Sequence, residues 1–123
     1  MEKKRKELLH RLYEQDGDKH VCHYCGIQEE DFLESWGEFY GLKKRGARLE
    51  IDHKDAVFIR GKSIIKVKRE DQEDTPEKCV LACTLCNMAK SNMFTHDEFR
   101  KVGRAIEEIW RERKRLGLKV KIS

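Results

Sequence analysis

Two pairs of cysteines in this sequence have the type and spacing to hold a metal ion. Cys22 and Cys25 form one Cys-x-x-Cys pair, and Cys83 and Cys86 form a second pair much later in the chain. Each pair can supply two thiolate ligands from a single turn, and four thiolates make up a closed structural zinc site. The spacing therefore predicts one zinc ion that ties the N-terminal part of the chain to its second half.

A fifth cysteine leaves an alternative ligand set. Cys79 lies four residues before Cys83, so these two thiols are another candidate pair. The Cys-x-x-Cys spacing favours Cys83 with Cys86, and Cys79 is then a small apolar residue of a strand. A further alternative is that one pair is fortuitous or that the thiols are simply buried.

A carboxylate and an imidazole stand side by side between the two cysteine pairs. Asp52 and His53 end an alternating run that favours a strand, so their side chains point to opposite faces. Asn87 directly follows the second pair. Asp52 and Asn87 offer oxygen ligands to Mg²⁺ or Mn²⁺, and His53 is free to take a proton from water. Alone, an Asp-His pair more often belongs to a turn or a surface; together, in this order, the residues predict phosphodiester hydrolysis.

These residues need a small set of elements to position them. Thr95 and Glu98 form a capping box that opens a long helix. The stretches 56–59 and 64–67 are either two short strands around Gly61 or part of a long loop. The patterns predict strands over 49–54 and 79–82, a terminal strand over 118–122, and helices over 2–14, from 28 to about 40, from about 84, and from 95 to 117.

Composition limits the class of protein. The 123 residues suit a single domain, and with 38% hydrophobic and 41% charged residues the core must be thin, so a metal would help to hold it. The net charge of +4 is compatible with a polyanionic partner. No apolar run is long enough for a membrane helix and no signal peptide is visible, so we expect a cytoplasmic protein whose cysteines bind metal rather than form disulfides.

The order of these motifs resembles the zinc-containing branch of the HNH endonucleases, over residues 20 to 95. The resemblance implies an α+β fold: a ββα-metal core, about 48–95, with a four-cysteine zinc site and flanking N- and C-terminal helices. It also implies that His53 is the general base, that Asp52 and Asn87 bind the catalytic Mg²⁺ or Mn²⁺, and that zinc is structural. The residues that carry the resemblance are Cys22, Cys25, Asp52, His53, Cys83, Cys86, Asn87 and Lys90.

One position departs from the family pattern. The family often has an asparagine just before the second strand, where it fixes the active-site loop, and here Lys78 stands at that place. Asp71, Asp74 or Thr75 are the candidates to hold the loop instead.

Two functions of different classes follow. The first is a metal-dependent endonuclease acting on DNA; the second is a zinc-stabilised module that binds nucleic acid or protein without catalysis. The Asp-His pair favours the first, since a binding module has no need of it. Because one active site cuts one strand, cutting both strands calls for a homodimer or two successive events. Expected phosphate contacts are Lys43, Lys44, Arg45, Arg48 and Lys90.

Overall fold

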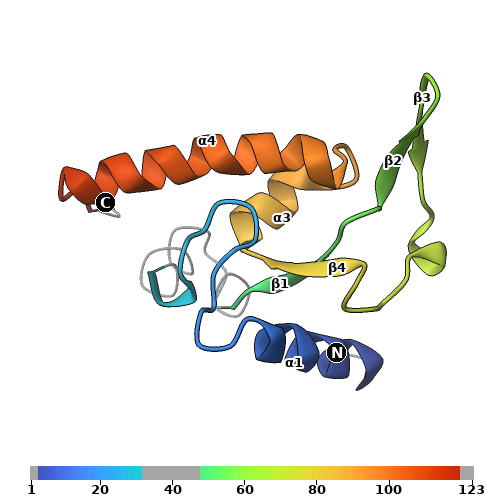
Figure 1. Ribbon diagram of the computed structural model, residues 1–123, viewed down its shortest axis with the longest axis horizontal. Helices are drawn as coiled ribbons and strands as arrows, with labels where there is room; N and C mark the ends of the chain where they lie inside the picture. The colour runs from blue at the N-terminus through green and yellow to red at the C-terminus, as the bar shows by residue number, and fades with distance from the viewer. Residues whose placement is uncertain (1–2, 32–47, 120–123) are drawn as a thin grey trace.

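The computed structural model describes residues 3–31 and 48–119 of the chain (Figure 1). Helices and two small antiparallel sheets give an α+β fold, as predicted. The elements are α1 (Lys3–Gln15), β1 (Glu50–His53), β2 (Val57–Arg60), β3 (Ser63–Lys66), the 3-10 turn η1 (Arg69–Asp71), β4 (Cys79–Ala82), α3 (Thr84–Lys90) and α4 (His96–Arg115). Most of the helix predicted from 28 to about 40 and of the strand predicted over 118–122 lies outside the described residues.

The central ribbon consists of β1 and β4, which pair antiparallel with His53 opposite Cys79 and Glu50 opposite Ala82. Both strands were predicted, and β4 has the predicted bounds. The buried pair of Ile51 and Leu81 lies in the middle of the register. In Figure 1 this ribbon runs between α1 on one side and α3 with α4 on the other, and α1 contacts β4 while α3 contacts β1. The ribbon, which carries Asp52 and His53 at the end of β1, is therefore flanked by helices on both sides.

The stretch after His53 forms a β-hairpin, which decides between the two short strands and the long loop that the sequence left open. Strands β2 and β3 pair antiparallel around a tight turn, with Ile59 opposite Ile64. Gly61 takes a positive φ of 61° in this turn, a conformation that glycine adopts without steric cost. The hairpin stands away from the helices, at the right of Figure 1.

Helix α4 is held by its cap and by one close approach. The Thr95 side chain accepts a hydrogen bond from the Glu98 amide and the Glu98 side chain accepts one from the Thr95 amide, which confirms the predicted capping box. At Gly103 a β-carbon would collide with the Tyr24 carbonyl oxygen. Glycine at this position lets α4 pack directly on the first cysteine turn.

The core is small and rich in sulfur. Its buried members come from α1, the first cysteine turn, β1, β4, α3 and α4. The core cluster contains Leu8, Leu12, Cys22, Tyr24, Cys25, Leu49, Ile51, Cys79, Leu81, Ala82, Cys83, Cys86 and Phe99.

Within the described part of the chain, no helix is both long enough and apolar enough to span a membrane.

Candidate active site and zinc centre

The four predicted zinc ligands come together in one buried cluster. The sulfur atoms of Cys22, Cys25, Cys83 and Cys86 all lie within 4.8 Å of one another. In a tetrahedral site, zinc–sulfur bonds of about 2.3 Å place the sulfur atoms about 3.8 Å apart. The sulfur atoms of Cys25 and Cys83 are 3.7 Å apart. The size and the donor set of the cluster therefore fit a structural zinc ion.

Local backbone geometry explains why each pair forms a ligand turn. The Gly26 amide donates to the Cys22 carbonyl oxygen at 2.9 Å, and Gly26 adopts a φ of 72°. Cys83 caps α3, where its sulfur accepts a hydrogen bond from the Cys86 amide at 3.4 Å. The two turns are joined through β4, because the His23 amide donates to the Leu81 carbonyl oxygen at 2.8 Å.

The electrostatics of the cluster call for a cation. Hydrogen bonds from Cys25 and then from Cys83 and Cys86 lower the pKa of Cys22 far below that of an ordinary thiol. Hydrogen bonds with Cys22 in turn raise the pKa of Cys83 and of Cys86 above the ordinary value. Without a cation, an ionised Cys22 thus disfavours the ionisation of Cys83 and Cys86, whereas zinc would allow all four to bind as thiolates.

Cys79 lies outside this cluster. Its sulfur faces the Glu73 carbonyl oxygen at 3.6 Å, and burial raises the pKa of its thiol to about 11. The structure thus agrees with the choice of Cys83 and Cys86 from the spacing, and Cys79 is the buried strand residue that was predicted.

Asp52 is the most enclosed carboxylate of the candidate active site, with 5% of its surface exposed. The Tyr24 hydroxyl donates to its Oδ2 atom at 2.5 Å, and the Lys90 ammonium lies 3.3 Å from Oδ2 and 3.4 Å from Oδ1. Burial raises the pKa of Asp52, while Tyr24 and Lys90 act in the opposite direction. Burial and the nearby Asp52 carboxylate raise the pKa of Tyr24, so its hydroxyl stays protonated and donates.

Lys90 corrects one prediction. The sequence suggested a contact with DNA phosphate, but the Lys90 side chain is fully buried. Its ammonium group is occupied by the Asp52 carboxylate and by the His53 carbonyl oxygen at 3.1 Å. Lys90 lies three residues after Asn87 on α3, and its side chain turns toward the ribbon rather than toward solvent. There its positive charge compensates the buried Asp52 carboxylate.

Asn87 also lies against β1, but its partner there is a different carboxylate. The Asn87 side-chain nitrogen donates to Glu50 Oε1 at 2.8 Å, and the Thr84 hydroxyl donates to Glu50 Oε2 at 2.8 Å. Glu50 and Asp52 are two residues apart on one strand, so they share the face that meets α3. The candidate site thus has a second carboxylate, Glu50, which the same alternation identifies in the sequence.

His53 points to the other side of the strand end. Its Nε2 atom lies 2.6 Å from Asp74 Oδ1, and 18% of its side chain is exposed. It borders a cavity of about 160 Å³ that also involves Asp55, Asp71, Glu73 and other residues. Asp74 was one of three candidates to replace the missing asparagine, and it contacts the imidazole directly.

Lys78 ties down the loop that follows His53. Its ammonium lies 3.4 Å from Asp55 Oδ2, and its carbonyl oxygen accepts a hydrogen bond from the Lys54 amide at 2.9 Å. The Lys54 ammonium in turn donates to the Glu77 carbonyl oxygen at 3.0 Å. Lys78, at the position where the HNH endonucleases often have an asparagine, therefore holds the loop through an ion pair and a backbone hydrogen bond. The imidazole itself is held by Asp74.

Of the other basic residues predicted to contact DNA phosphates, only Arg48 lies within the described residues. Arg48 lies over the Tyr13 ring, 5.4 Å from its centroid, beside the start of β1. Lys43, Lys44 and Arg45 lie outside the described residues. Their role as phosphate contacts stays a prediction.

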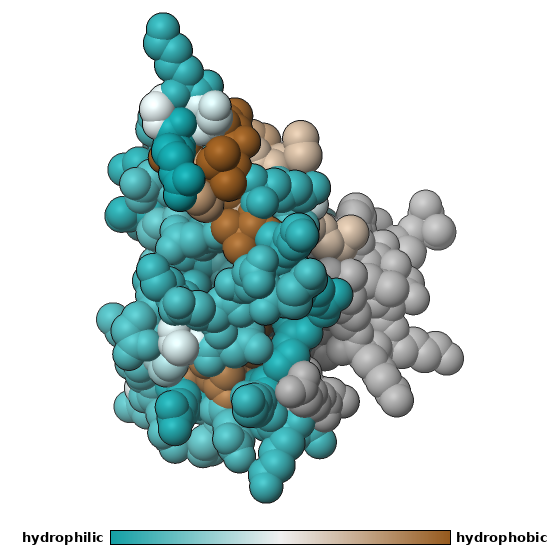
Figure 2. Space-filling view, turned by 90° about the vertical axis from the view of Figure 1, so that its right-hand side faces the viewer, coloured by the Kyte–Doolittle hydropathy of each residue, from teal (hydrophilic) through white to brown (hydrophobic). Residues whose placement is uncertain are grey.

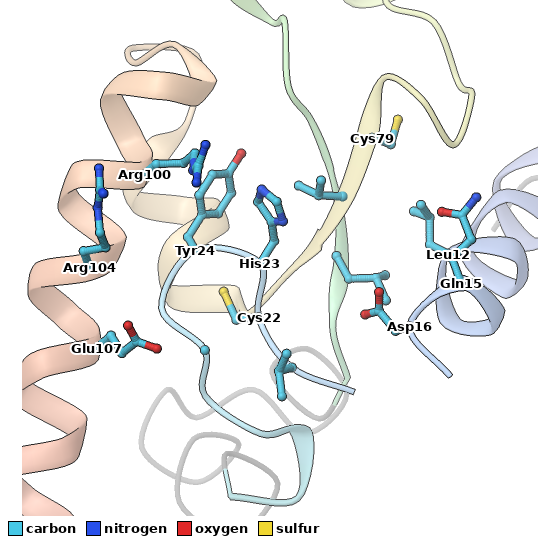
Figure 3. Close-up of a pocket in the computed structure, with 14 residues that line it drawn as sticks. Leu12, Gln15, Asp16, Cys22, His23, Tyr24, Cys79, Arg100, Arg104 and Glu107 are labelled. Atoms are coloured by element: carbon cyan, nitrogen blue, oxygen red, sulfur yellow. The ribbon is translucent and has the colours of Figure 1, made fainter. Parts of the chain in front are cut away.

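A larger cavity of about 440 Å³ lies between α1 and α4, next to the first cysteine turn (Figure 3). His23 and Tyr24 form part of its wall, together with Arg100 and Arg104 from α4. His23 Nε2 lies 2.9 Å from His96 Nε2, and burial, then the charge of His96, lower the pKa of His23 to about 4. A neutral His23 is therefore favoured at this wall near pH 7.

The contact between Tyr24 and Asp52 gives a direct test of the geometry. We expect Tyr24→Phe to lower the free energy of unfolding by about 1–3 kcal/mol, because a buried carboxylate loses a hydrogen bond. In an Asp52→Asn background the same substitution should cost measurably less, since the two residues are coupled. Urea unfolding of the four proteins of this cycle checks the prediction. Equal costs in the two backgrounds would show that Tyr24 does not act on Asp52.

Comparison with known proteins supports the architecture. No protein-family profile matches the chain, and no curated protein matches it. A solved structure, described as the rare-cutting HNH restriction endonuclease PacI, is similar with a TM-score of 0.55. The match covers 93% of this chain and 83% of that chain at 22% sequence identity, so the likeness concerns the fold. The chain therefore shares its fold with an HNH endonuclease, which confirms at the level of fold the resemblance found in its motifs.

Proposed function

We propose that this chain is a metal-dependent endonuclease that hydrolyses DNA phosphodiester bonds. The observation that carries the proposal is the end of β1: Asp52 faces α3, while His53 faces Asp74 on the opposite side. The proposed metal-binding carboxylate and the proposed proton acceptor are thus neighbours in sequence whose side chains lie on opposite faces of one strand. The similarity in fold to an HNH restriction endonuclease supports the same interpretation.

The donor chemistry of the α3-facing side fits a hard divalent cation. Asp52 and Asn87 are the proposed ligands, and the nearby Glu50 carboxylate adds negative charge. Bound there, Mg²⁺ or Mn²⁺ would supply positive charge that stabilises the phosphate and the leaving 3′ oxygen. Lys90 already partly neutralises Asp52, so the ion and the ammonium compete for the same carboxylate.

His53 is the proposed general base. Because the Asp74 carboxylate accepts a hydrogen bond from Nε2, the neutral imidazole carries its proton on Nε2 and has a free lone pair on Nδ1. A water oxygen attacks phosphorus while its proton passes to Nδ1. The bond between phosphorus and the 3′ oxygen then breaks, and that oxygen takes up a proton from solvent. The products are a 5′-phosphate and a 3′-hydroxyl, as the family resemblance implies.

The second candidate is the zinc-stabilised binding module. The observation in its favour is the enclosure of Asp52, whose two oxygen atoms already have partners in Tyr24 and Lys90. A plasmid assay with the wild-type protein distinguishes the two candidate functions. With its zinc in place, an endonuclease nicks supercoiled plasmid in Mg²⁺ or Mn²⁺ and stops when the free divalent ion is removed, whereas a binding module shifts the plasmid in a gel and leaves it intact under all conditions.

The metal ligands can be tested with a matched pair of substitutions. Asp52→Asn keeps the shape of the side chain and removes its charge. We expect the Mg²⁺ concentration for half-maximal nicking to rise by at least about 10- to 100-fold, because loss of a partner that only supports a ligand already has an effect of this size. Asp97→Asn, on the exposed start of α4, should leave it unchanged. Zinc content should be equal in both proteins. An unchanged Mg²⁺ requirement in Asp52→Asn would contradict the assignment.

A further inference from the structure

The β2–β3 hairpin has an apolar surface that its own fold does not cover. Ile59 and Ile64 face each other across the two strands and are 57% and 68% exposed. Two isoleucines at such exposure leave apolar surface in water, and burying that surface against a partner is favourable. Figure 2 shows dark brown atoms at the upper end of the molecule, where the hairpin stands in Figure 1, bordered by teal atoms.

Charge identifies the kind of partner that would cover this pair. The segment 57–68 contains Arg60, Lys62, Lys66 and Lys68 and has no carboxylate. Among the described residues, none of these four cations forms an ion pair; Arg60 instead lies over the Phe58 ring, 5.3 Å from its centroid. An apolar strip with cations around it complements a surface that has apolar groups between two rows of negative charge. The major groove of duplex DNA has thymine methyl groups between its two phosphate rows, whereas a second copy of this hairpin would bring like charges together.

We infer that the β2–β3 hairpin enters the major groove of duplex DNA, with Ile59 and Ile64 against base edges and the lysines on the phosphates. This rests on the proposed function for the choice of DNA as partner. The major groove is about 12 Å wide and admits a two-stranded ribbon. The apolar group that it presents is the C5-methyl of thymine, which aliphatic side chains contact. The hairpin therefore favours DNA segments rich in thymine.

The position of the hairpin connects this contact to the candidate site. Only Lys54, Asp55 and Ala56 separate His53 from the first residue of β2. The loop is fixed by Lys78, and the Val67 amide donates to the Ala56 carbonyl oxygen at 2.9 Å, which closes the base of the hairpin. A strand end and a hairpin joined in this way move together, so groove contact by the hairpin orients the backbone relative to His53.

Binding to DNA that lacks the thymine methyl tests the inference. In a His53→Ala background, which prevents cleavage, two versions of one duplex are compared: one with thymine and one with uracil throughout. We expect Ile59→Thr/Ile64→Thr, which keeps β-branching, to weaken binding to thymine DNA about tenfold, the loss for two partly buried aliphatic side chains. The parent should prefer the thymine duplex, and the threonine variant should bind both duplexes equally.

Further variants separate charge from apolar contact. Lys62→Ala/Lys66→Ala should lower the slope of log affinity against log salt by about 0.9 for each phosphate that the protein no longer neutralises, without changing the preference for thymine. Ile109→Thr, on the exposed side of α4, removes a comparable exposed isoleucine and should bind like the parent. Ile109→Thr thus shows whether the loss of affinity is specific to the hairpin, and the lysine variant separates the contribution of charge from that of apolar contact.

Three outcomes would overturn the inference. The first is a threonine variant that keeps the parent's affinity and its preference for thymine. The second is a parent that does not distinguish the two duplexes. The third is a dimer that dissociates in the threonine variant, because the isoleucines then join two copies of the chain. Nicking of plasmid by the protein with His53 intact decides separately on the endonuclease, so the hairpin inference can fail while the proposed function stands.

Discussion

Cys22→Ala is expected to unfold the protein or lower its melting temperature drastically, and to abolish stoichiometric zinc binding. Zinc in small structural sites contributes about 10–16 kcal/mol in peptides at neutral pH, which is as large as the whole stability of about 5–15 kcal/mol of a typical domain. Here the ligands join the first cysteine turn to the start of α3, and the core around them is thin. Removal of one thiolate therefore takes away most of what holds the two halves together.

Cys79→Ala is the matched control for this experiment. Cys79 is 2% exposed and Cys22 is 1% exposed, so both substitutions remove a buried thiol of the same size. Of these two cysteines, only Cys22 belongs to the four-cysteine cluster. We expect Cys79→Ala to cost about 1 kcal/mol, the usual effect of a point mutation, and to keep about one zinc per chain. Elemental analysis and thermal unfolding followed by circular dichroism provide the two measurements. Loss of zinc in Cys79→Ala, or equal melting temperatures for the two variants, would contradict the assigned ligand set.

The parts that could be predicted from the sequence depend on short spacings. The cysteine pairs, the alternation in β1, the apolar run of β4 and the capping box each lie within a few consecutive residues, where the backbone geometry of a turn, strand or helix fixes which side chains meet. The pairing of distant cysteines followed from chemistry, since zinc requires four ligands. The requirement for four ligands does not by itself choose between Cys79 and Cys86; the Cys-x-x-Cys spacing made that choice, and the cluster in the structure agrees with it.

The side chains around Asp52 and His53 could not be predicted in this way. Tyr24 reaches Asp52 from 28 positions away, and Lys90 from 38. A lysine on a short helix is usually exposed, and only the burial of a carboxylate on the facing strand makes the inward orientation favourable. Asp74 belongs to a segment with little regular structure, so no periodicity indicated which of its polar residues would meet the imidazole.

The role of His53 predicts the largest effect on catalysis. We expect His53→Ala to lower the rate of plasmid nicking about 10²- to 10⁴-fold, the contribution of a general base. Zinc content and the affinity for DNA should be retained, because His53 is not a cysteine-site ligand and its side chain is partly exposed, beside Asp74. His10→Ala is the control, since His10 is highly exposed on α1 and pairs with Glu14 of the same helix.

Asp74 provides the second half of this test. If Asp74 holds the proton on Nε2 and leaves Nδ1 free, Asp74→Asn should slow nicking by a smaller factor than His53→Ala, because the amide can also donate and favour the wrong tautomer. In a protein that already lacks the imidazole, Asp74→Asn should have no further effect on the rate, since a positioning residue acts only through the group that it positions. A His53→Ala protein that nicks at the wild-type rate, with contaminating nuclease excluded, would place the general base elsewhere. An additional loss from Asp74→Asn in that background would instead give Asp74 a role of its own, beyond orienting His53.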